Sequence, residues 1–191
     1  SRNLATSHLL NDTVRGANKS IFSEAATAET PNNGGGYLSA FVSDGFSVTS
    51  GSSGDDAVND GSDTYASWNW LAGTAFSNDA SSTSVGTIDS EGQINTKAGF
   101  AIIKHTGTGS AGTLAHGLSQ APDTIWLKSR SDGEGWVSFW NTPGMGPTKF
   151  MGFNSTGAAS DSDGEWNDTA PTSSLFTIGT QGRVNTDTKD Y

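Results

Sequence analysis

The sequence predicts an all-β fold of antiparallel β-sandwich repeat units, in one and a half copies and with very little helix. Three observations support this prediction. Short apolar segments alternate with turns rich in Gly, Asn and Asp, no convincing amphipathic helix is present, and two parts of the chain repeat each other. We expect fewer than about one residue in ten to be helical.

The repeat relates residues 1–65 to residues from about 130 to 191. The matching segments are residues 19–22 with 149–152, 45–48 with 175–178, and 58–65 with 184–191. The offset is close to 130 residues and falls to 126 across a loop that is longer in the first copy. Repetition on this scale indicates modules in an array, not one catalytic pocket.

Three regions follow from the repeat. Residues 1–70 form a partial first β-unit, 71–97 a connector, and 98–191 a second β-unit that lacks its closing strand. The closing strand expected at residues 65–70 has no counterpart after Tyr191. We therefore expect an unfilled sheet edge in the second unit and a chain that is not a self-sufficient monomer, because it is a fragment or takes a strand from a neighbour. Alternatively, residues 68–70 of the same chain could supply the missing strand to the second unit.

The first unit is expected to begin with a short helix that carries Leu4, Leu9 and Leu10. Residues 20–23 then form a strand, 30–36 a turn and 51–61 a polar loop. A hairpin of residues 37–41 and 46–49 is predicted around Ser43-Asp44-Gly45, since Asp-Gly between apolar segments favours a tight turn. Residues 65–70 alternate with a period of two, which predicts a strand with one buried face.

The connector and second unit are justified in the same way. The connector is polar, with one strand expected near residues 84–88. The predicted strands of the second unit are residues 100–105, 124–128, 136–140, 149–153 and 174–178, with turns at 106–112 and 131–135. Recurrence of large apolar residues in these strands predicts a core of Phe46, Trp68, Trp70, Phe100, Ile102, Trp126, Trp136, Phe150 and Phe176.

Composition excludes several classes of function. The net charge is -10 with only 10 Lys and Arg residues, so we expect neither nucleic-acid binding nor attraction to acidic membranes. There is no Cys and no apolar segment long enough to span a membrane. Hydrophobic residues make up 32%, but 6 Trp and 9 Phe indicate loop-rich β-modules and not a disordered chain.

The candidate metal and catalytic residues also have ordinary structural roles. His8, His105 and His116 lack metal-ligand spacing. Two acidic segments offer oxygen ligands for calcium, although turn formation explains them better and neither supplies a bidentate Glu at the required spacing. These segments are Asp55-Asp56 with Asn59, Asp60 and Asp63, and Asp161-Ser162-Asp163-Gly164-Glu165. Ser53-Gly54 lacks the strand-turn-helix context of a nucleophile elbow.

Sugar-binding features were also considered. Trp136, Trp140 and Trp166 are candidates for a glycan platform, because Trp stacks on sugar rings. Core packing is the favoured role for Trp136 and Trp140, and Trp166 is the best candidate for exposure. Asn-x-Ser/Thr sequons occur at Asn11, Asn18, Asn154 and Asn167.

An ordered series of motifs resembles a recurrent module in virion proteins of marine and cyanobacterial tailed phages. The motifs are Asp12-Thr13-Val14-Arg15-Gly16-Ala17, Tyr65-Ala66-Ser67-Trp68-Asn69-Trp70, Ala98-Gly99-Phe100-Ala101-Ile102-Ile103, Thr106-Gly107-Thr108-Gly109, Ala115-His116-Gly117-Leu118 with Ala121-Pro122, and Trp166-Asn167-Asp168-Thr169-Ala170-Pro171-Thr172-Ser173-Ser174 with Phe176. The resemblance covers almost the whole chain. The chain departs from that module in the missing closing strand and in the turn Thr142-Pro143-Gly144-Met145-Gly146.

The resemblance implies a structural component of a phage virion, in a tail fibre or another surface appendage. It implies assembly and display at the virion surface, with other copies or other virion proteins as partners and with host-surface glycans as a further partner. It transfers no catalytic, cofactor-binding or metal-binding residue, so we expect no enzyme and no membrane insertion. The first alternative is a secreted carbohydrate-binding module or adhesin. The second is a glycan-depolymerising enzyme, which would require two carboxylates facing each other across a cleft.

Overall fold

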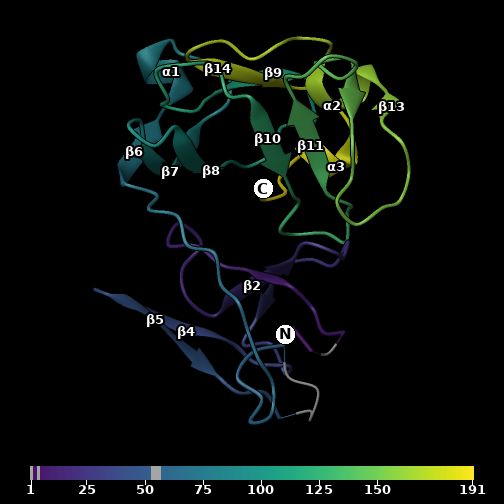
Figure 1. The fold of residues 1–191 in the computed structure, drawn as a ribbon. Helices are drawn as coiled ribbons and strands as arrows, with labels where there is room; N and C mark the ends of the chain where they lie inside the picture. Colours follow the sequence, from purple (N-terminus) through teal and green to yellow (C-terminus); the bar gives the residue numbers. More distant parts are fainter. Residues whose placement is uncertain (1, 4, 53–56) are drawn as a thin grey trace.

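The computed structural model describes residues 2–3, 5–52 and 57–191, so Leu4 of the expected helix lies outside it. The chain forms two lobes joined by one extended crossing segment (Figure 1). The described residues of 2–65 make up the first lobe, and residues 74–191 make up the second. Within the described residues the three helices are short, and the predicted all-β fold with antiparallel sheets is confirmed.

The first lobe contains a three-stranded sheet and a hairpin. In the sheet, β2 (Lys19–Phe22) lies between β1 (Leu9–Leu10) and β3 (Thr30–Pro31). The hairpin pairs β4 (Tyr37–Val42) with β5 (Gly45–Thr49) around the predicted tight turn. The helix expected around Leu9 and Leu10 is wrong, because these residues pair with Ile21 and Phe22.

The second lobe opens with a three-stranded antiparallel sheet. Its strands are β6 (Thr74–Asn78), β7 (Ser90–Asn95) and β8 (Phe100–Lys104), with helix α1 (Ala80–Thr83) between β6 and β7. Residues 71–97 are therefore more than a connector, since they supply two of these strands. The expected strand near residues 84–88 is reduced to an isolated bridge between Ile88 and Leu114.

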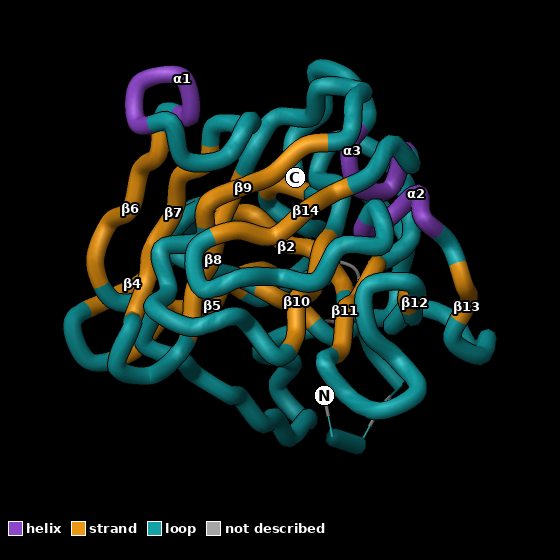
Figure 2. Tube along the Cα trace, turned by 90° about the horizontal axis from the view of Figure 1, so that it is seen from above, coloured by secondary structure: helices purple, strands orange, loops and turns teal. Residues whose placement is uncertain are grey.

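Three further strand pairs complete the second lobe. Strand β9 (Gly112–Ala115) pairs with β14 (Leu175–Ile178), β10 (Thr124–Leu127) with β11 (Val137–Trp140), and β12 (Lys149–Phe150) with β13 (Ser160–Asp161). Helices α2 (Asp163–Trp166) and α3 (Gly182–Asn185) lie near β12–β14 in the chain. Seen from above, β9 and β14 run side by side (Figure 2). The two strands come from opposite halves of the lobe.

The predicted repeat is present in one of the strand registers. Ile21 lies opposite Leu10 in the first copy, whereas its counterpart Met151 lies opposite Ser138, two residues before the position equivalent to Leu10. The pairing of β2 with β3 recurs 130 residues on, because Lys19 opposite Pro31 corresponds to Lys149 opposite Asp161. The register of β2 with β3 is thus shared by the two copies, while that of β1 with β2 is not.

Hydrogen bonds outside the strands repeat as well. The backbone N–H of Asp60 donates to the Tyr65 hydroxyl at 2.9 Å, and that of Thr186 donates to the Tyr191 hydroxyl at 2.8 Å. The N–H of Arg2 donates to the carbonyl of Thr64 at 2.7 Å, as Arg130 does to Asp190 at 2.8 Å. The two copies therefore share a framework of bonds in addition to a sequence pattern.

The copies differ at the hairpin. The segment that corresponds to β4 is residues 167–172, where Asn167 and Asp168 have positive φ values and Pro171 has no backbone N–H. A ladder strand is disfavoured there, although the bond that closes the turn is kept. In it Thr172, the counterpart of Val42, donates to the carbonyl of Leu175 at 2.8 Å. Strand β14 pairs with β9 and strand β11 with β10, so the second unit uses its own strands as partners and residues 65–70 do not supply one.

The hydrophobic core lies in the second lobe and joins both halves of it. Its buried members are Ile88, Leu114, Leu127, Val137, Phe139, Trp166, Phe176, Ile178, Val184 and Tyr191. Residues 88–127 and residues 137–191 contribute to one cluster, so neither half buries its apolar face alone. Of the predicted core, Trp136 and Phe176 are buried, while Phe100, Ile102 and Phe150 are half-buried.

Four of the predicted core residues are exposed. Trp68 and Trp70 lie in an irregular segment in place of the predicted strand, and Phe46 and Trp126 lie on strands with open faces. A period of two shows that alternate side chains share a face, but not that anything covers that face.

Candidate assembly surface

Residues 66–71, here called the aromatic strap, carry the most exposed large hydrophobic side chains of the described residues. Trp68 is 74% exposed, Trp70 is 62% exposed and Leu71 is 78% exposed. The strap is fixed to the second lobe in two places. Trp70 stacks on Phe100 with ring centroids 6.2 Å apart, and Asn95 donates its amide to the carbonyl of Leu71 at 3.1 Å. The structure therefore holds two indole rings in solvent on a defined support.

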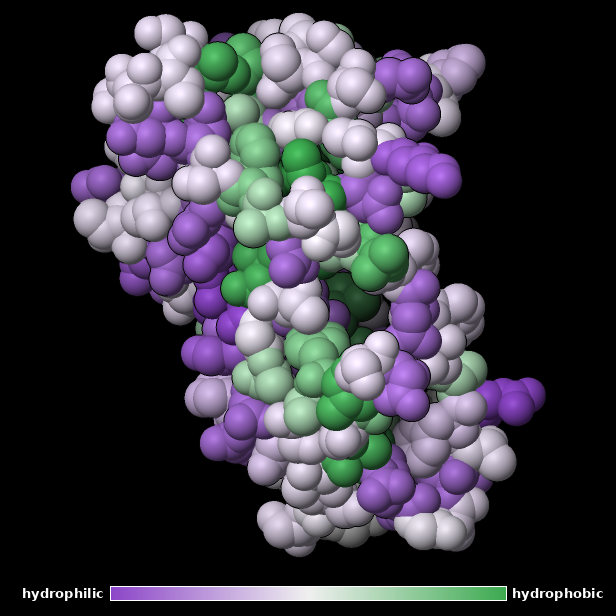
Figure 3. Space-filling view, turned by 90° about the vertical axis from the view of Figure 1, so that its left-hand side faces the viewer, coloured by the Kyte–Doolittle hydropathy of each residue, from purple (hydrophilic) through white to green (hydrophobic). Residues whose placement is uncertain are grey.

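The turn end of the β4–β5 hairpin is a second exposed apolar surface. Phe41, Val42 and Phe46 are all at least 38% exposed, and Phe41 lies directly opposite Phe46. Figure 3 views the molecule from the side on which β5 and β6 lie, and hydrophobic residues form a discontinuous green band over both lobes. Exposed apolar surface that extends over two lobes is typical of interaction sites.

Trp126 on β10 is a separate exposed aromatic. It is 51% exposed and packs edge-to-face on Phe153, with ring centroids 4.7 Å apart. Its indole N–H donates to the Thr124 hydroxyl at 3.1 Å. The ring is thus held in one orientation with part of its surface open.

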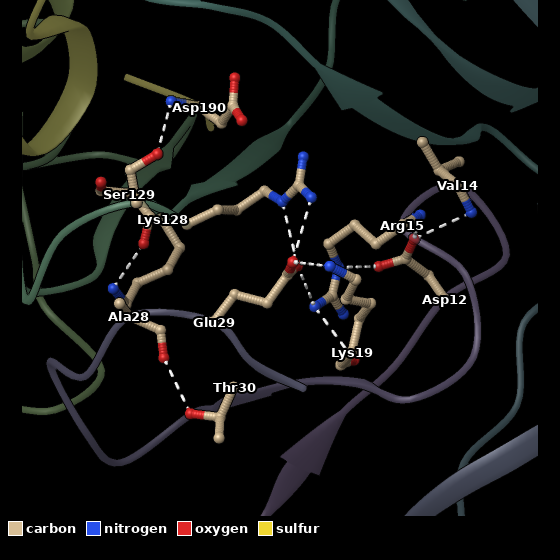
Figure 4. A network of polar contacts seen from close by, with 12 residues as sticks. Asp12, Val14, Arg15, Lys19, Ala28, Glu29, Thr30, Lys128, Ser129 and Asp190 are labelled. Carbon is tan, nitrogen blue, oxygen red and sulfur yellow. Dashed lines mark hydrogen bonds and ion pairs between the residues drawn. The ribbon is translucent and has the colours of Figure 1, made fainter. Parts of the chain in front are cut away.

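A network of charged residues joins the two lobes (Figure 4). The guanidinium of Arg130 binds both carboxylate oxygens of Glu29, at 3.0 and 3.1 Å. Arg15 contacts the same carboxylate at 3.3 Å and binds Asp12, while Lys19 lies 3.5 Å from Glu29. Because Glu29 belongs to the first lobe and Arg130 to the second, the bidentate pair connects the repeat copies.

The electrostatics of this junction follow from burial and charge. Burial would raise the pKa of Glu29, but the hydrogen bonds and positive charges of Arg130 and Arg15 outweigh it and hold the pKa below its ordinary value. Burial lowers the pKa of Lys128 to about 8, against the opposing charges of Glu134 and Asp132. The Lys128 ammonium donates to the carbonyl of Ala26 at 3.2 Å, which adds another contact between the lobes.

The histidines are dispersed and do not form a site. His105 is buried, stacks on Tyr191 at 4.9 Å and lies with Nε2 3.3 Å from the carbonyl of Val184. His116 is buried and contacts the carbonyl of Thr172 at 3.2 Å. His8 is exposed near Glu24. Each of the three has a local partner of its own.

The acidic segment of residues 161–165 forms local structure. Asp163 and Glu165 lie in the first turn of α2, with Ser162 as its N-cap, and Glu165 pairs with Arg183 at 3.2 Å. In the other segment, Asp55, Asp56 and the pair Ser53-Gly54 lie outside the described residues. The described residues hold no group of three or more His, Asp or Glu side chains that could bind a metal.

The expected glycan platform is not assembled from the predicted residues. Trp166, the residue expected to be exposed, is buried at 1% exposure and packs edge-to-face against Phe139. Trp136 is also buried and donates to the carbonyl of Phe22 at 2.7 Å. The exposed indoles are instead Trp68, Trp70 and Trp126. The local sequence did not mark Trp68 and Trp70 as exposed, because their alternation with polar residues is also the pattern of a half-buried strand.

The sequons have structural roles at three of their four positions. Asn11 accepts from the Ser20 hydroxyl at 3.3 Å, Asn154 accepts from the backbone N–H of Trp136 at 3.0 Å, and Asn167 is the C-cap of α2. Among the described residues, no helix has the length and hydrophobicity needed to cross a bilayer.

A shallow cleft lies beside the junction. It has a volume of about 350 Å³, and Val14 of the first lobe lines it together with Phe76, Gln93 and other residues of β6–β8. Glu91 and Lys104 on its wall form an ion pair at 3.0 Å. The wall thus offers one carboxylate that is paired with a cation, and not the two opposed carboxylates of a glycosidase.

The comparison with protein families gives one match. A family described as "Domain of unknown function (DUF7483)" matches residues 1–191, and the chain belongs to that family. No curated protein and no solved structure matches the chain.

Proposed function

We propose that this member of the DUF7483 family is a structural component of a phage virion, located in a tail fibre or another surface appendage. It acts by assembly and display at the virion surface. Its partners are other copies of itself or other virion proteins. The sequence resemblance to tandem modules of tailed-phage virion proteins supplies the biological setting of this proposal.

The observation that carries the proposal is the repeated bonding framework. The second copy of the repeat shares its core with residues 88–127, which lie between the copies. The first copy occupies the other lobe, and the two copies are joined by the pair of Glu29 with Arg130. A chain in which each half-unit packs on its neighbour is suited to extension into an array.

The test is to locate the chain in particles. Virus particles purified from the source culture should contain the chain by mass spectrometry, and gold-labelled antibody fragments raised against it should mark an appendage in electron micrographs. Labelling of the appendage supports the proposal. A chain that stays in the particle-free fraction of the culture contradicts it.

A carbohydrate-binding module or adhesin is the second candidate, and the exposed Trp68 and Trp70 favour it. Two solvent-facing indoles on a fixed support are able to stack on sugar rings. On a glycan array, binding that is lost on changing Trp68 and Trp70 to Ala, and kept in a matched Trp126→Ala variant, would favour this candidate over pure assembly.

A further inference from the structure

Strands β5 and β14 occupy equivalent positions in the two copies of the repeat, but their partners differ. Strand β5 pairs with β4, which precedes it in the same hairpin. Strand β14 pairs with β9, which comes from the segment between the copies. If both strands pair through the same edge, the two arrangements exclude each other. If they pair through opposite edges, one strand can bind a β4-type and a β9-type partner at the same time.

The bonds around β14 show which edge faces β9. The N–H of His116 donates to the carbonyl of Ser174 at 3.3 Å on the side of β9. The carbonyl of Leu175 accepts from Thr172 and so points away from β9. Because backbone groups alternate along a strand, those of Phe176 and Ile178 face β9.

The turn of the hairpin shows which edge of β5 faces β4. Val42 and Gly45 close a two-residue turn, and the closing pair of such a turn is hydrogen-bonded. Gly45, Ser47 and Thr49 therefore face β4. The backbone groups of Phe46 and Val48 face the opposite edge, where no strand pairs with β5 in the described part of the chain.

Phe46 and Val48 are the counterparts of Phe176 and Ile178, 130 residues earlier. The open edge of β5 is thus the same edge that β14 uses to bind β9. Hairpin partner β4 occupies the other edge and does not block it. In the first lobe the backbone groups of this edge therefore have no partner strand. In the second lobe the equivalent groups of β14 pair with β9.

The side chains show the same difference. Phe176 is 7% exposed and Ile178 is fully buried, whereas Phe46 is 39% exposed and Val48 is half-buried. In the second lobe Leu114 of β9 lies opposite Phe176, and Gly112 lies opposite Ile178. The open edge therefore suits a strand with a large apolar residue opposite Phe46 and a small one opposite Val48.

The edge also lacks the features that protect natural sheet edges. Free edges usually carry Lys, Pro or a bulge on the exposed strand. Strand β5 has the sequence Gly-Phe-Ser-Val-Thr, with no charge and no Pro, and the irregularity of this hairpin lies on β4, between Leu38 and Ala40. An uncharged edge of this kind is suited to pairing with an uncharged strand such as β9.

We propose that the open edge of β5 binds a strand of the β9 type, supplied by another copy of this repeat, so that successive modules join strand to strand. The inference rests on the proposed function, because it names the partner through which the module assembles. Because β14 holds β9 within this chain, the donor is an equivalent strand of another copy whose own β14 equivalent does not occupy it.

The probe is a synthetic peptide of residues 110–118, which contains β9 and its flanks, added to the full chain. Amide hydrogen exchange is followed by NMR at four residues. In the free chain we expect fast exchange at Phe46 and Val48 and slow exchange at Phe176 and Ile178. With peptide, exchange at Phe46 and Val48 should slow by at least about ten-fold, as strand addition protects amides.

Two matched peptides control for non-specific binding. A peptide with Leu114→Pro loses an N–H that faces the partner strand and should not protect Phe46 or Val48. A peptide with Thr113→Pro should still protect them, because the N–H of Thr113 points away from β14 and donates to the Thr87 hydroxyl at 2.9 Å. Equal protection by both peptides overturns the proposal. Slow exchange at Phe46 and Val48 in the free chain at low concentration overturns it as well.

The experiment separates this inference from the proposed function. A chain that labels virus appendages but does not bind the peptide keeps its structural function and assembles through another surface. A chain that binds the peptide but is absent from particles keeps the strand pairing and loses the virion setting.

Discussion

Tyr65 and Tyr191 have the same local role at the ends of the two repeat copies. In each copy the tyrosine hydroxyl accepts the backbone N–H of the residue five positions earlier, Asp60 or Thr186. The Tyr191 hydroxyl also donates to the carbonyl of Gly182. The tyrosine at the end of each copy therefore closes a turn through the same hydrogen bond.

We expect Tyr191→Phe to lower the free energy of unfolding by about 1–3 kcal/mol, since the partly buried N–H of Thr186 loses its acceptor. Tyr65→Phe should cost less, because Tyr65 is only half-buried. Urea unfolding of both variants measures the difference. A loss for Tyr65→Phe that matches or exceeds that of Tyr191→Phe would contradict this account.

His105 makes the stability of the second lobe depend on pH. Burial lowers its pKa to about 4, while the carbonyl of Val184 and the charge of Asp190 act in the opposite direction. Between about pH 6.5 and pH 4 the unfolded chain binds a proton that the folded chain does not, so stability falls as the pH falls.

The contribution of His105 across that interval is on the order of 3 kcal/mol. His105→Gln should remove it, so unfolding free energy measured from pH 7 to pH 4 should fall less steeply than in the wild type. The exposed His8→Gln serves as the control and should leave the slope unchanged. Identical slopes for wild type and His105→Gln would refute the assignment.

At the scale of elements, tryptophan is buried beside a strand and exposed in the aromatic strap. Trp136 adjoins β11 and is buried against the first lobe, with its indole N–H bound to Phe22. Trp68 lies in the aromatic strap, where the alternating pattern predicts a strand that does not form. The segment instead crosses between the lobes as an extended chain.

Alanine substitution should separate the two roles. Trp136→Ala should destabilise the protein by about 3–5 kcal/mol through loss of a buried ring. Trp68→Ala should change stability by less than about 0.5 kcal/mol, because its ring is in solvent. Thermal unfolding of the two variants provides the comparison. A loss of several kcal/mol for Trp68→Ala would show that the ring packs against the protein after all.

At the scale of the whole molecule, the junction of the lobes depends on Glu29. Its carboxylate is contacted by Arg130, Arg15 and Lys19, and its side chain is 8% exposed. The pKa of Glu29 is held below its ordinary value, so its contribution is present above about pH 4.5 and is lost as the pH falls through the folded pKa.

Glu29→Gln should destabilise the protein by about 2–3 kcal/mol, since the half-buried guanidinium of Arg130 loses its counter-charge. Limited proteolysis should then cleave the segment that joins the lobes more rapidly. The control is Glu91→Gln, in the exposed pair with Lys104, which should cost less than about 1 kcal/mol. Equal effects of the two changes would mean that the junction does not depend on this pair.

Much of the fold is predictable from local sequence. The β4–β5 hairpin follows from Asp44-Gly45 between apolar segments, and the repeat follows from segments that recur at a nearly constant offset. Strand β9 could not be predicted in this way. Its Gly-Thr-Leu-Ala sequence has little strand propensity, and Gly112 is favoured because a Cβ there would lie 2.7 Å from Cδ1 of Ile88, which would have to move.

The sequence by itself determined the all-β class, the turns and the repeat, because each of these depends on residues that are close together in the chain. Only the tertiary structure decided which faces are covered. Trp166 is buried because Phe139 packs on it, and Trp68 is exposed because no strand reaches it. Burial and strand pairing depend on segments far apart in the sequence, which local periodicity does not encode. For the same reason, only the folded chain shows that β5 keeps open the edge that β14 has filled.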